Sequence, residues 1–215
     1  PHRGFIFNSS EGSESILKGL TIMHGYADTG AGLYANAASP VIEGCVLQRL
    51  DGLPGWVTSE ITGGGAACVN GSQATFTDCS FRYNTGMDGA ALYISAGSDI
   101  TVDNCVIQQN SMTYPYVGAA TIKIDSASAV FSDCRISNNY MYDINFEDYG
   151  SPGVVAVQSD AVFSRCIFSG NANSNGYGFG ASAIVFSGGS PTVEQCTFFD
   201  NADVYSPYFG THASC

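Results

Sequence analysis

Three aspartates and two arginines recur beside cysteines in this chain and are its nearest candidates for catalysis. Asp78, Asp103 and Asp133 lie one or two residues before a cysteine, while Arg135 and Arg165 lie next to one. Two carboxylates about 5 to 9.5 Å apart can cleave a glycosidic bond, and a lyase needs a base together with a cation that stabilises the sugar carboxylate. The same residues also fit the solvated outer face of a repeat. We therefore assign no catalytic residue from the sequence.

Other residues with reactive or metal-binding side chains do not form a recognisable site. His2, His24 and His212 lie far apart in the sequence, and no partner carboxylate is visible beside His24. The chain contains no Cys-x-x-Cys pair, which disfavours a zinc site. The acidic residues in 143–148 lack the alternating spacing of a calcium loop. The sequence thus predicts no cofactor and no bound metal.

The cysteines belong to a nine-residue motif, apolar-x-x-Cys-x-apolar-x-x-Asn, that occurs six times. It is cleanest from Val102 to Asn110, and a degenerate copy without cysteine surrounds Leu20. Successive cysteines are 34, 26, 29, 32 and 30 residues apart, and a period in this range indicates a repeat architecture. The motif cysteines are Cys45, Cys79, Cys105, Cys134, Cys166 and Cys196. The motif asparagines are Asn84, Asn110, Asn139, Asn171 and Asn201, with Leu50 in place of the first.

Each copy of the motif follows a glycine-led apolar run and a small polar turn, as in Gly89-Ala90-Ala91 and then Ala96-Gly97-Ser98. One repeat therefore reads as strand, tight turn, strand, corner and variable loop. Two or three short strands cannot bury an apolar face alone, so successive repeats must stack. We predict an all-β fold, a right-handed parallel β-helix of about seven coils. Residues 1–215 would form one β-helix domain, a segment or protomer of a longer array.

Stacked coils lie about 4.8 Å apart, so equivalent residues form ladders. The apolar positions three before and two after each cysteine, and the cysteine itself, are predicted to face inward. The cysteines form either a column of buried thiols or vertical disulfides that join 45 with 79, 105 with 134 and 166 with 196. Each asparagine is predicted to sit at a corner, where its amide satisfies backbone groups that the bend leaves unpaired. Lys123 and Asp125 alternate on one strand and are predicted to form an exposed pair.

The charge and composition exclude some classes of partner. The net charge is −12, which argues against binding to nucleic acid or to an anionic membrane surface. No apolar run approaches the length of about 18 residues that a membrane-spanning helix needs. We expect a protein that does not span a membrane.

Aromatic residues are concentrated in the variable loops, which should all leave the helix at one edge. This aromatic edge either binds sugars or a protein partner or folds down as packing over the wall of the coil. Asn8 and Asn70 also begin Asn-x-Ser sequences and are candidate N-glycosylation sites. The aromatic edge comprises Trp56, Tyr114, Tyr116, Tyr140, Tyr142, Tyr149, Tyr177, Tyr205 and Tyr208.

The repeats resemble those of chlamydial polymorphic membrane proteins and similar β-helical surface proteins. In that pattern Gly-Gly-Ala-apolar alternates with Phe-x-x-Asn. The first motif is fullest at 64–66, and the second is seen at 81–84, 168–171 and 198–201. The resemblance covers nearly the whole chain and implies an extracellular or cell-surface location. It is less informative about function, because one fold hosts many functions.

We therefore expect a non-catalytic extracellular structural or adhesive β-helix protein, stacked end to end into a fibre. Its partners would be other copies of itself or another surface protein, with glycans as further ligands. The alternative is a polysaccharide-active enzyme of the lyase or epimerase type, or a glycan-binding module.

Overall fold

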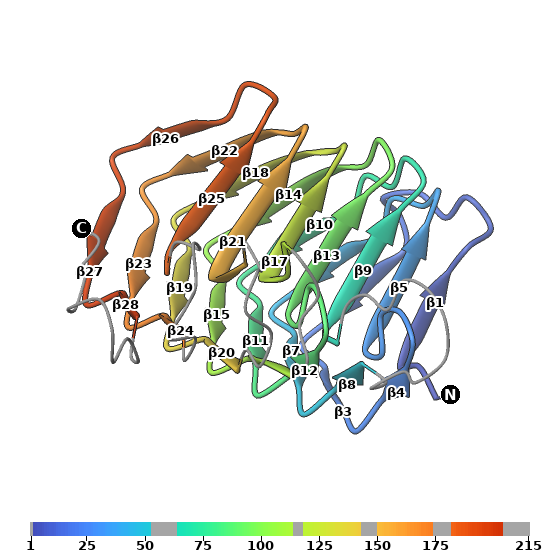
Figure 1. Ribbon diagram of the computed structural model, residues 1–215. Coiled ribbons are helices and arrows are strands. Elements are labelled where there is room, and N and C mark those ends of the chain that lie inside the picture. The colour runs from blue at the N-terminus through green and yellow to red at the C-terminus, as the bar shows by residue number, and fades with distance from the viewer. Residues whose placement is uncertain (1, 53–63, 114–117, 143–149, 174–181, 204–215) are drawn as a thin grey trace.

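The computed structural model describes residues 2–52, 64–113, 118–142, 150–173 and 182–203. In these residues the backbone forms 28 short strands, arranged as four parallel sheets of seven strands each. Each strand of the inner coils pairs with the strand four places before it and the strand four places after it, and the strands of the first and last coils pair on one side only. One coil therefore contributes one strand to each sheet, and the coils stack from the N-terminal to the C-terminal end (Figure 1). The predicted all-β parallel solenoid is confirmed.

The four sheets are numbered here in the order in which the chain enters them. The first contains β1 (Phe5–Phe7), β5 (Leu33–Asn36), β9 (Ala66–Val69), β13 (Leu92–Ser95), β17 (Ala120–Asp125), β21 (Ser151–Val157) and β25 (Ile184–Ser187). The second contains β2 (Ile16–Lys18), β6 (Val41–Glu43), β10 (Thr75–Thr77), β14 (Asp99–Asp103), β18 (Ser128–Ser132), β22 (Asp160–Ser164) and β26 (Thr192–Glu194). The third contains β3 (Thr21–Met23), β7 (Val46–Gln48), β11 (Ser80–Arg82), β15 (Val106–Gln108), β19 (Arg135–Ser137), β23 (Ile167–Ser169) and β27 (Thr197–Phe199). The fourth contains β4 (Tyr26–Ala27), β8 (Asp51–Gly52), β12 (Thr85–Gly86), β16 (Ser111–Thr113), β20 (Tyr140–Tyr142), β24 (Ala172–Asn173) and β28 (Ala202–Asp203).

Two corners of each coil are made by a single residue in the left-handed conformation. The residue before each motif cysteine has a positive φ, for example 56° at Asp78 and 54° at Arg165. The residue before each motif asparagine does too, as at Asn138 with a φ of 53°. This conformation costs a residue with a Cβ roughly 1 to 2 kcal/mol, which the stacking must offset. The corners bend the chain so that the cysteine and asparagine that follow them point inward.

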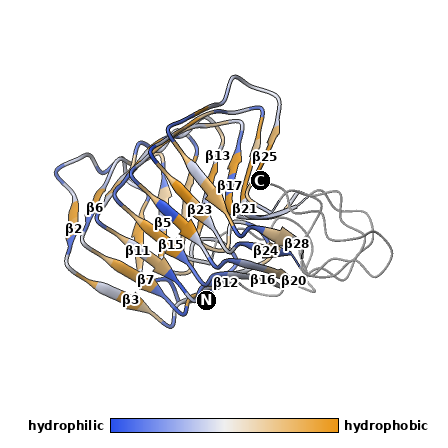
Figure 2. Ribbon diagram, turned by 90° about the vertical axis from the view of Figure 1, so that its left-hand side faces the viewer, coloured by the Kyte–Doolittle hydropathy of each residue, from blue (hydrophilic) through white to orange (hydrophobic). Residues whose placement is uncertain are grey.

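The core lies inside the stack and is built from the predicted ladder positions. In the fourth coil Val102, Cys105 and Ile107 are each at most 1% exposed, and the other inner copies match them. Figure 2 shows the hydrophobic segments recurring from coil to coil, as along β7, β11 and β15. Phe131 stacks on Phe163 of the next coil, with ring centroids 4.9 Å apart. The inward orientation predicted for these positions is confirmed in the inner coils.

The cysteine column consists of free thiols. Seven cysteines lie in the described residues and all are free. The Cys134 thiol donates to the carbonyl oxygen of Val102 in the preceding coil at 3.4 Å and to that of Ser132 at 3.2 Å. The same two contacts recur at Cys45, Cys79, Cys105, Cys166 and Cys196. The structure thus has the thiol column and not the vertical disulfides.

The asparagine column links the coils through buried hydrogen bonds. Asn139 is fully buried, and its Nδ2 donates to the Ile107 carbonyl and to Asn171 Oδ1, both at 3.0 Å. Its Oδ1 in turn accepts from the backbone and side-chain nitrogens of Asn110, each at 3.0 Å. The predicted structural role is confirmed. Leu50 fills the same position in the second coil, fully buried, and its amide donates to Asn84 Oδ1.

Candidate functional site

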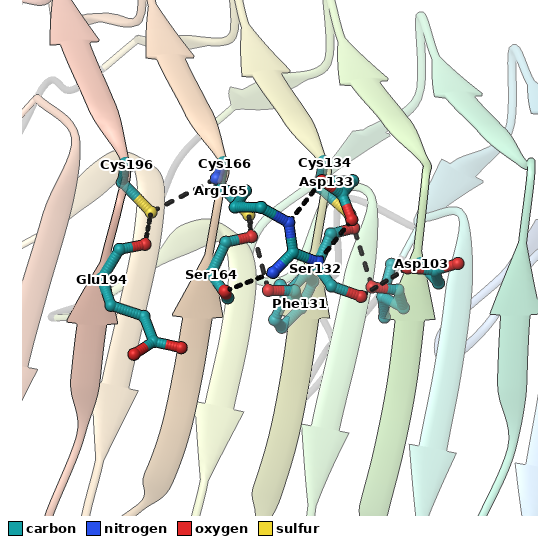
Figure 3. A network of polar contacts seen from close by, with 11 residues as sticks. Asp103, Phe131, Ser132, Asp133, Cys134, Ser164, Arg165, Cys166, Glu194 and Cys196 are labelled. Atoms are coloured by element: carbon teal, nitrogen blue, oxygen red, sulfur yellow. Dashed lines mark hydrogen bonds and ion pairs between the residues drawn. The ribbon is translucent and has the colours of Figure 1, made fainter.

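Asp103, Asp133 and Arg165, which were among the residues singled out for catalysis, lie at the corner between the second and third sheets (Figure 3). Asp133 and Arg165 occupy the same corner position in neighbouring coils. Arg165 Nε donates to Asp133 Oδ1 at 2.8 Å, and Nη2 donates to Oδ2 at 2.6 Å. The guanidinium holds the pKa of the Asp133 carboxyl below its usual value. Both side chains are about half exposed, so water screens this pair.

The remaining corner residues also have partners. Asp103 accepts a hydrogen bond from the Ser132 hydroxyl of the next coil. Asp78 accepts one from Asn104 Nδ2 at 2.6 Å. The Nε of Arg135 donates to the hydroxyl of Ser137 on its own strand, at 3.2 Å. The corner is thus a band of polar side chains, and the aspartates in it contact side chains of the following coil.

Only two residues of the predicted aromatic edge fall within the described part of the chain. Tyr140 is 37% exposed at the start of β20, and Tyr142 ends that strand in register with Thr113. From residue 2 onward, each described stretch ends at a fourth-sheet strand, namely β8, β16, β20, β24 or β28. The predicted variable loops therefore all follow strands of one sheet. Trp56, Tyr114, Tyr116, Tyr149, Tyr177, Tyr205 and Tyr208 lie outside the described residues, as do His212 and the acidic residues in 143–148.

The two candidate glycosylation sites lie on the surface. Asn8 is exposed directly after β1. Asn70 is exposed with a φ of 55°, and its Nδ2 donates to Asn36 Oδ1 at 2.8 Å. The hydroxyl of Ser72, the third residue of that sequence, is buried and donates to the backbone. Glycosylation at either site stays a prediction.

The exposure and the partner of Lys123 differ from those that the sequence predicted. We expected an exposed pair with Asp125, but Lys123 is only 7% exposed. Its Nζ donates to the Gly118 carbonyl and lies 3.8 Å from Oδ2 of Asp88, which precedes β13 in the coil before. Outward-facing strand residues need not be exposed, because neighbouring coils can cover them. Sequence periodicity alone therefore did not identify Asp88 as the partner.

Asp88 is the most perturbed carboxyl in the described structure. Burial raises its pKa to about 6, although Lys123 and the amides of Ala120 and Gly89 lower it. The amide of Ala120 donates to Asp88 Oδ1 at 3.1 Å. The nearby Thr121 hydroxyl is buried and has no hydrogen-bond partner in the described residues. A carboxyl with a shifted pKa beside a buried cation is typical of functional sites, although structural ion pairs also produce it.

A shallow hollow lies at the corner between the first and second sheets. Its volume is about 230 Å³, and Ser98, Asp99, Ser128, Gln158 and Asp160 contribute to its lining. Small-molecule sites usually enclose about 300 to 1,000 Å³ and are mostly apolar. The hollow is smaller and polar, so it does not resemble such a site.

Within the described residues, no three His, Cys, Asp or Glu side chains are grouped as metal ligands. No helix there is long and apolar enough to cross a membrane.

Comparison with known proteins agrees with this architecture. A family model described as a right-handed β-helix region matches residues 2–140 and, in an overlapping match, residues 57–213. The chain is 29% identical over 160 residues to a metabotropic glutamate receptor-like protein R of Dictyostelium discoideum. That match covers 63% of this chain but only 9% of the relative. No solved structure matches the chain.

Proposed function

We propose that this chain, which belongs to the right-handed β-helix family, is a non-catalytic structural or binding element of an extracellular or cell-surface protein. The observation that carries this proposal is the state of the corner aspartates. Asp78, Asp103 and Asp133 are the best-placed carboxylates for polysaccharide chemistry, and each contacts a side chain of the next coil. These aspartates are thus engaged in contacts between successive coils.

The comparison supports a surface role without defining it. The relative from Dictyostelium discoideum is named as receptor-like, and the chain matches less than a tenth of it. A β-helix segment within such a large protein fits a spacer or a binding surface. The resemblance to chlamydial polymorphic membrane proteins points to the same kind of location.

The edge formed by the fourth sheet is the part of the surface that we assign to partner binding. Segments of different length and sequence leave the coil there, directly after β8, β16, β20, β24 and β28. Variable segments on a rigid scaffold commonly carry recognition. The partner would be another surface protein, a glycan or a second copy of the chain. End-to-end stacking into a fibre stays a prediction that electron microscopy can test.

The experiment that tests the non-catalytic assignment is a turnover assay on acidic polysaccharides. Unsaturated or reducing products are measured with the unchanged chain, with Asp103→Asn and with Asp133→Asn. Asp200→Asn is the matched control for Asp133→Asn, because both residues are exposed and have a positive φ. We expect no turnover by any of the four proteins. Turnover that disappears in Asp103→Asn or Asp133→Asn but persists in Asp200→Asn would show that the proposal is wrong.

A polysaccharide-active enzyme is the second candidate, favoured by the buried pair of Asp88 and Lys123. A general acid needs a pKa near the working pH, and burial raises the pKa of Asp88 to about 6. If this pair were catalytic, turnover would be lost in Asp88→Asn and retained in Asp103→Asn. The same assay with that variant separates the two candidate sites.

A further inference from the structure

Lys123 and Asp88 belong to neighbouring coils and meet at the outer side of the first sheet. Lys123 lies on β17 between Ile122 and Ile124, whose side chains are in the core. Its side chain therefore faces away from the core, toward the segment that carries Asp88 before β13. The Nζ and Oδ2 atoms are 3.8 Å apart. An amine and a carboxyl are thus close together on two coils that are held in fixed register.

The pair is largely shielded from water. The Lys123 side chain is 9% exposed and that of Asp88 is 16% exposed. Ala90, two residues after Asp88, and Ala119, between Gly118 and Ala120, are fully buried. They form an apolar cluster with Met112 and Met141. Burial of this kind favours the protonated form of the Asp88 carboxyl, which is the form that an amine can attack.

We propose that Lys123 and Asp88 react with each other and form an intramolecular amide cross-link between the fourth and fifth coils. The neutral Nζ attacks Cγ of the protonated Asp88 carboxyl, so that an N–C bond forms. The C–O bond to the hydroxyl then breaks, and the hydroxyl leaves as water with a proton from the nitrogen. One water molecule is released, and no oxidant, reductant or further reactant is needed.

Several described groups are placed to assist this condensation. The Ala120 amide donates to Asp88 Oδ1 at 3.1 Å, where it stabilises the negative charge that develops on that oxygen during attack. The Gly118 carbonyl accepts from Nζ and orients the amine. Thr121 and Asp125 alternate with the core residues on β17, so they share the outward face with Lys123. Thr121 has a buried hydroxyl without a partner in the described residues.

The inference is independent of the proposed structural or binding function, since a cross-link strengthens the wall of the coil whatever that wall binds. It is incompatible with the second candidate, because an Asp88 held in an amide bond cannot act as a general acid. The cross-link closes a loop of the chain that contains residues 114–117. The cross-link would hold the base of that segment to the preceding coil. Heat or proteolysis would then open this part of the chain less readily.

The test is mass spectrometry of the purified 215-residue chain with reduced and alkylated cysteines. The expected intact mass is one water molecule lower than the mass calculated for the sequence with alkylated cysteines. Trypsin cannot cleave after a lysine whose amine is in an amide bond. The peptides 83–123 and 124–135 should therefore be replaced by one peptide, 83–135. Its mass should be one water lower than that of the linear peptide of the same sequence. An unmodified intact mass with normal cleavage after Lys123 would overturn the proposal.

Variants identify the two atoms that are joined. Lys123→Arg and Asp88→Ala should have their full sequence masses. Asp88→Asn should lose ammonia instead of water and give the same cross-linked mass as the unchanged chain. Asp88 precedes Gly89, and an Asp-Gly pair can also lose water by closing a succinimide on its own backbone. Loss of water with normal cleavage after Lys123 would indicate that reaction and would overturn the cross-link.

Discussion

Removing one rung of the asparagine column should destabilise the stack far more than removing a neighbouring asparagine. Asn139→Ala deletes four buried hydrogen bonds, which join Asn139 to Asn110, Ile107 and Asn171. The substitution leaves the buried amide of Asn110 and the carbonyl of Ile107 without the hydrogen bonds that this side chain makes to them. An unsatisfied buried polar group costs about 1 to 3 kcal/mol. We therefore expect Asn139→Ala to lower the free energy of unfolding by roughly 4 kcal/mol.

Asn138 provides the matched control, because it is the adjacent residue and has the same side chain. It is exposed and has a φ of 53°, a conformation that glycine adopts without strain. We expect Asn138→Gly to change the free energy of unfolding by less than about 0.5 kcal/mol. Asn139→Leu is a further variant, since Leu50 occupies the equivalent position in the second coil. It should recover part of the loss by filling the space.

Urea denaturation followed by circular dichroism measures these differences, and hydrogen exchange of the Asn110 amide reports the rung directly. That amide donates to Asn139 Oδ1, so Asn139→Ala should speed its exchange while Asn138→Gly should not. Repeat proteins can unfold in parts, and the urea midpoint of the whole chain then does not report the stability of one rung. The exchange measurement does report it. A loss of stability below about 1 kcal/mol in Asn139→Ala, or an equal loss in Asn138→Gly, would refute the reasoning.

Three more predictions concern the corner, the thiols and the buried pair. Arg165→Met should lower the unfolding midpoint slightly at low salt and hardly at all at high salt, because the Asp133 pair is exposed. This loss should disappear as the pH falls through the lowered pKa of Asp133. In the native chain a thiol reagent should modify Cys196 before the other cysteines of the described residues, which are all buried; simultaneous labelling would contradict this. The Lys123→Met variant keeps the Asp88 carboxyl with its raised pKa. The free energy of unfolding of this variant should therefore fall by about 3 kcal/mol or more as the pH rises from 4 through 6 and above. Urea titrations at several pH values measure this fall. The unchanged chain should not show this fall, because its amide cross-link leaves no Asp88 carboxyl to titrate.

The sequence predicted the coil architecture because the residues that define it repeat. The spacing of cysteine, apolar and asparagine positions fixes which side chains face the core, and Cys105 and Asn110 lie where that spacing places them. Each rule holds in several copies, so one deviation such as Leu50 does not hide the pattern. The inner coils follow it more closely than the ends, where Leu20 and Val193 are 38% and 40% exposed.

The corner contacts could be predicted only in part. The sequence indicates that Asp133 and Arg165 occupy the same position in adjacent copies, and the structure pairs them. It does not reveal that this position has a left-handed backbone, because Asp, Asn, Arg and Gln all occupy it in different copies. A glycine there would have signalled the turn, but only Gly19 and Gly44 do so.

The pair of Asp88 and Lys123 shows where alternation along a strand stops being informative. Alternation correctly assigns Lys123 to the outward side of β17, but exposure depends on what the neighbouring coils place over that side. Asp88 lies outside any strand and outside the nine-residue motif, in a turn that the repeat does not constrain. The pairing of Leu92 with Ile122 sets the two coils in register and brings the turn alongside Lys123. A register between coils is a tertiary property, so a buried charge pair that depends on it has to be found in three dimensions.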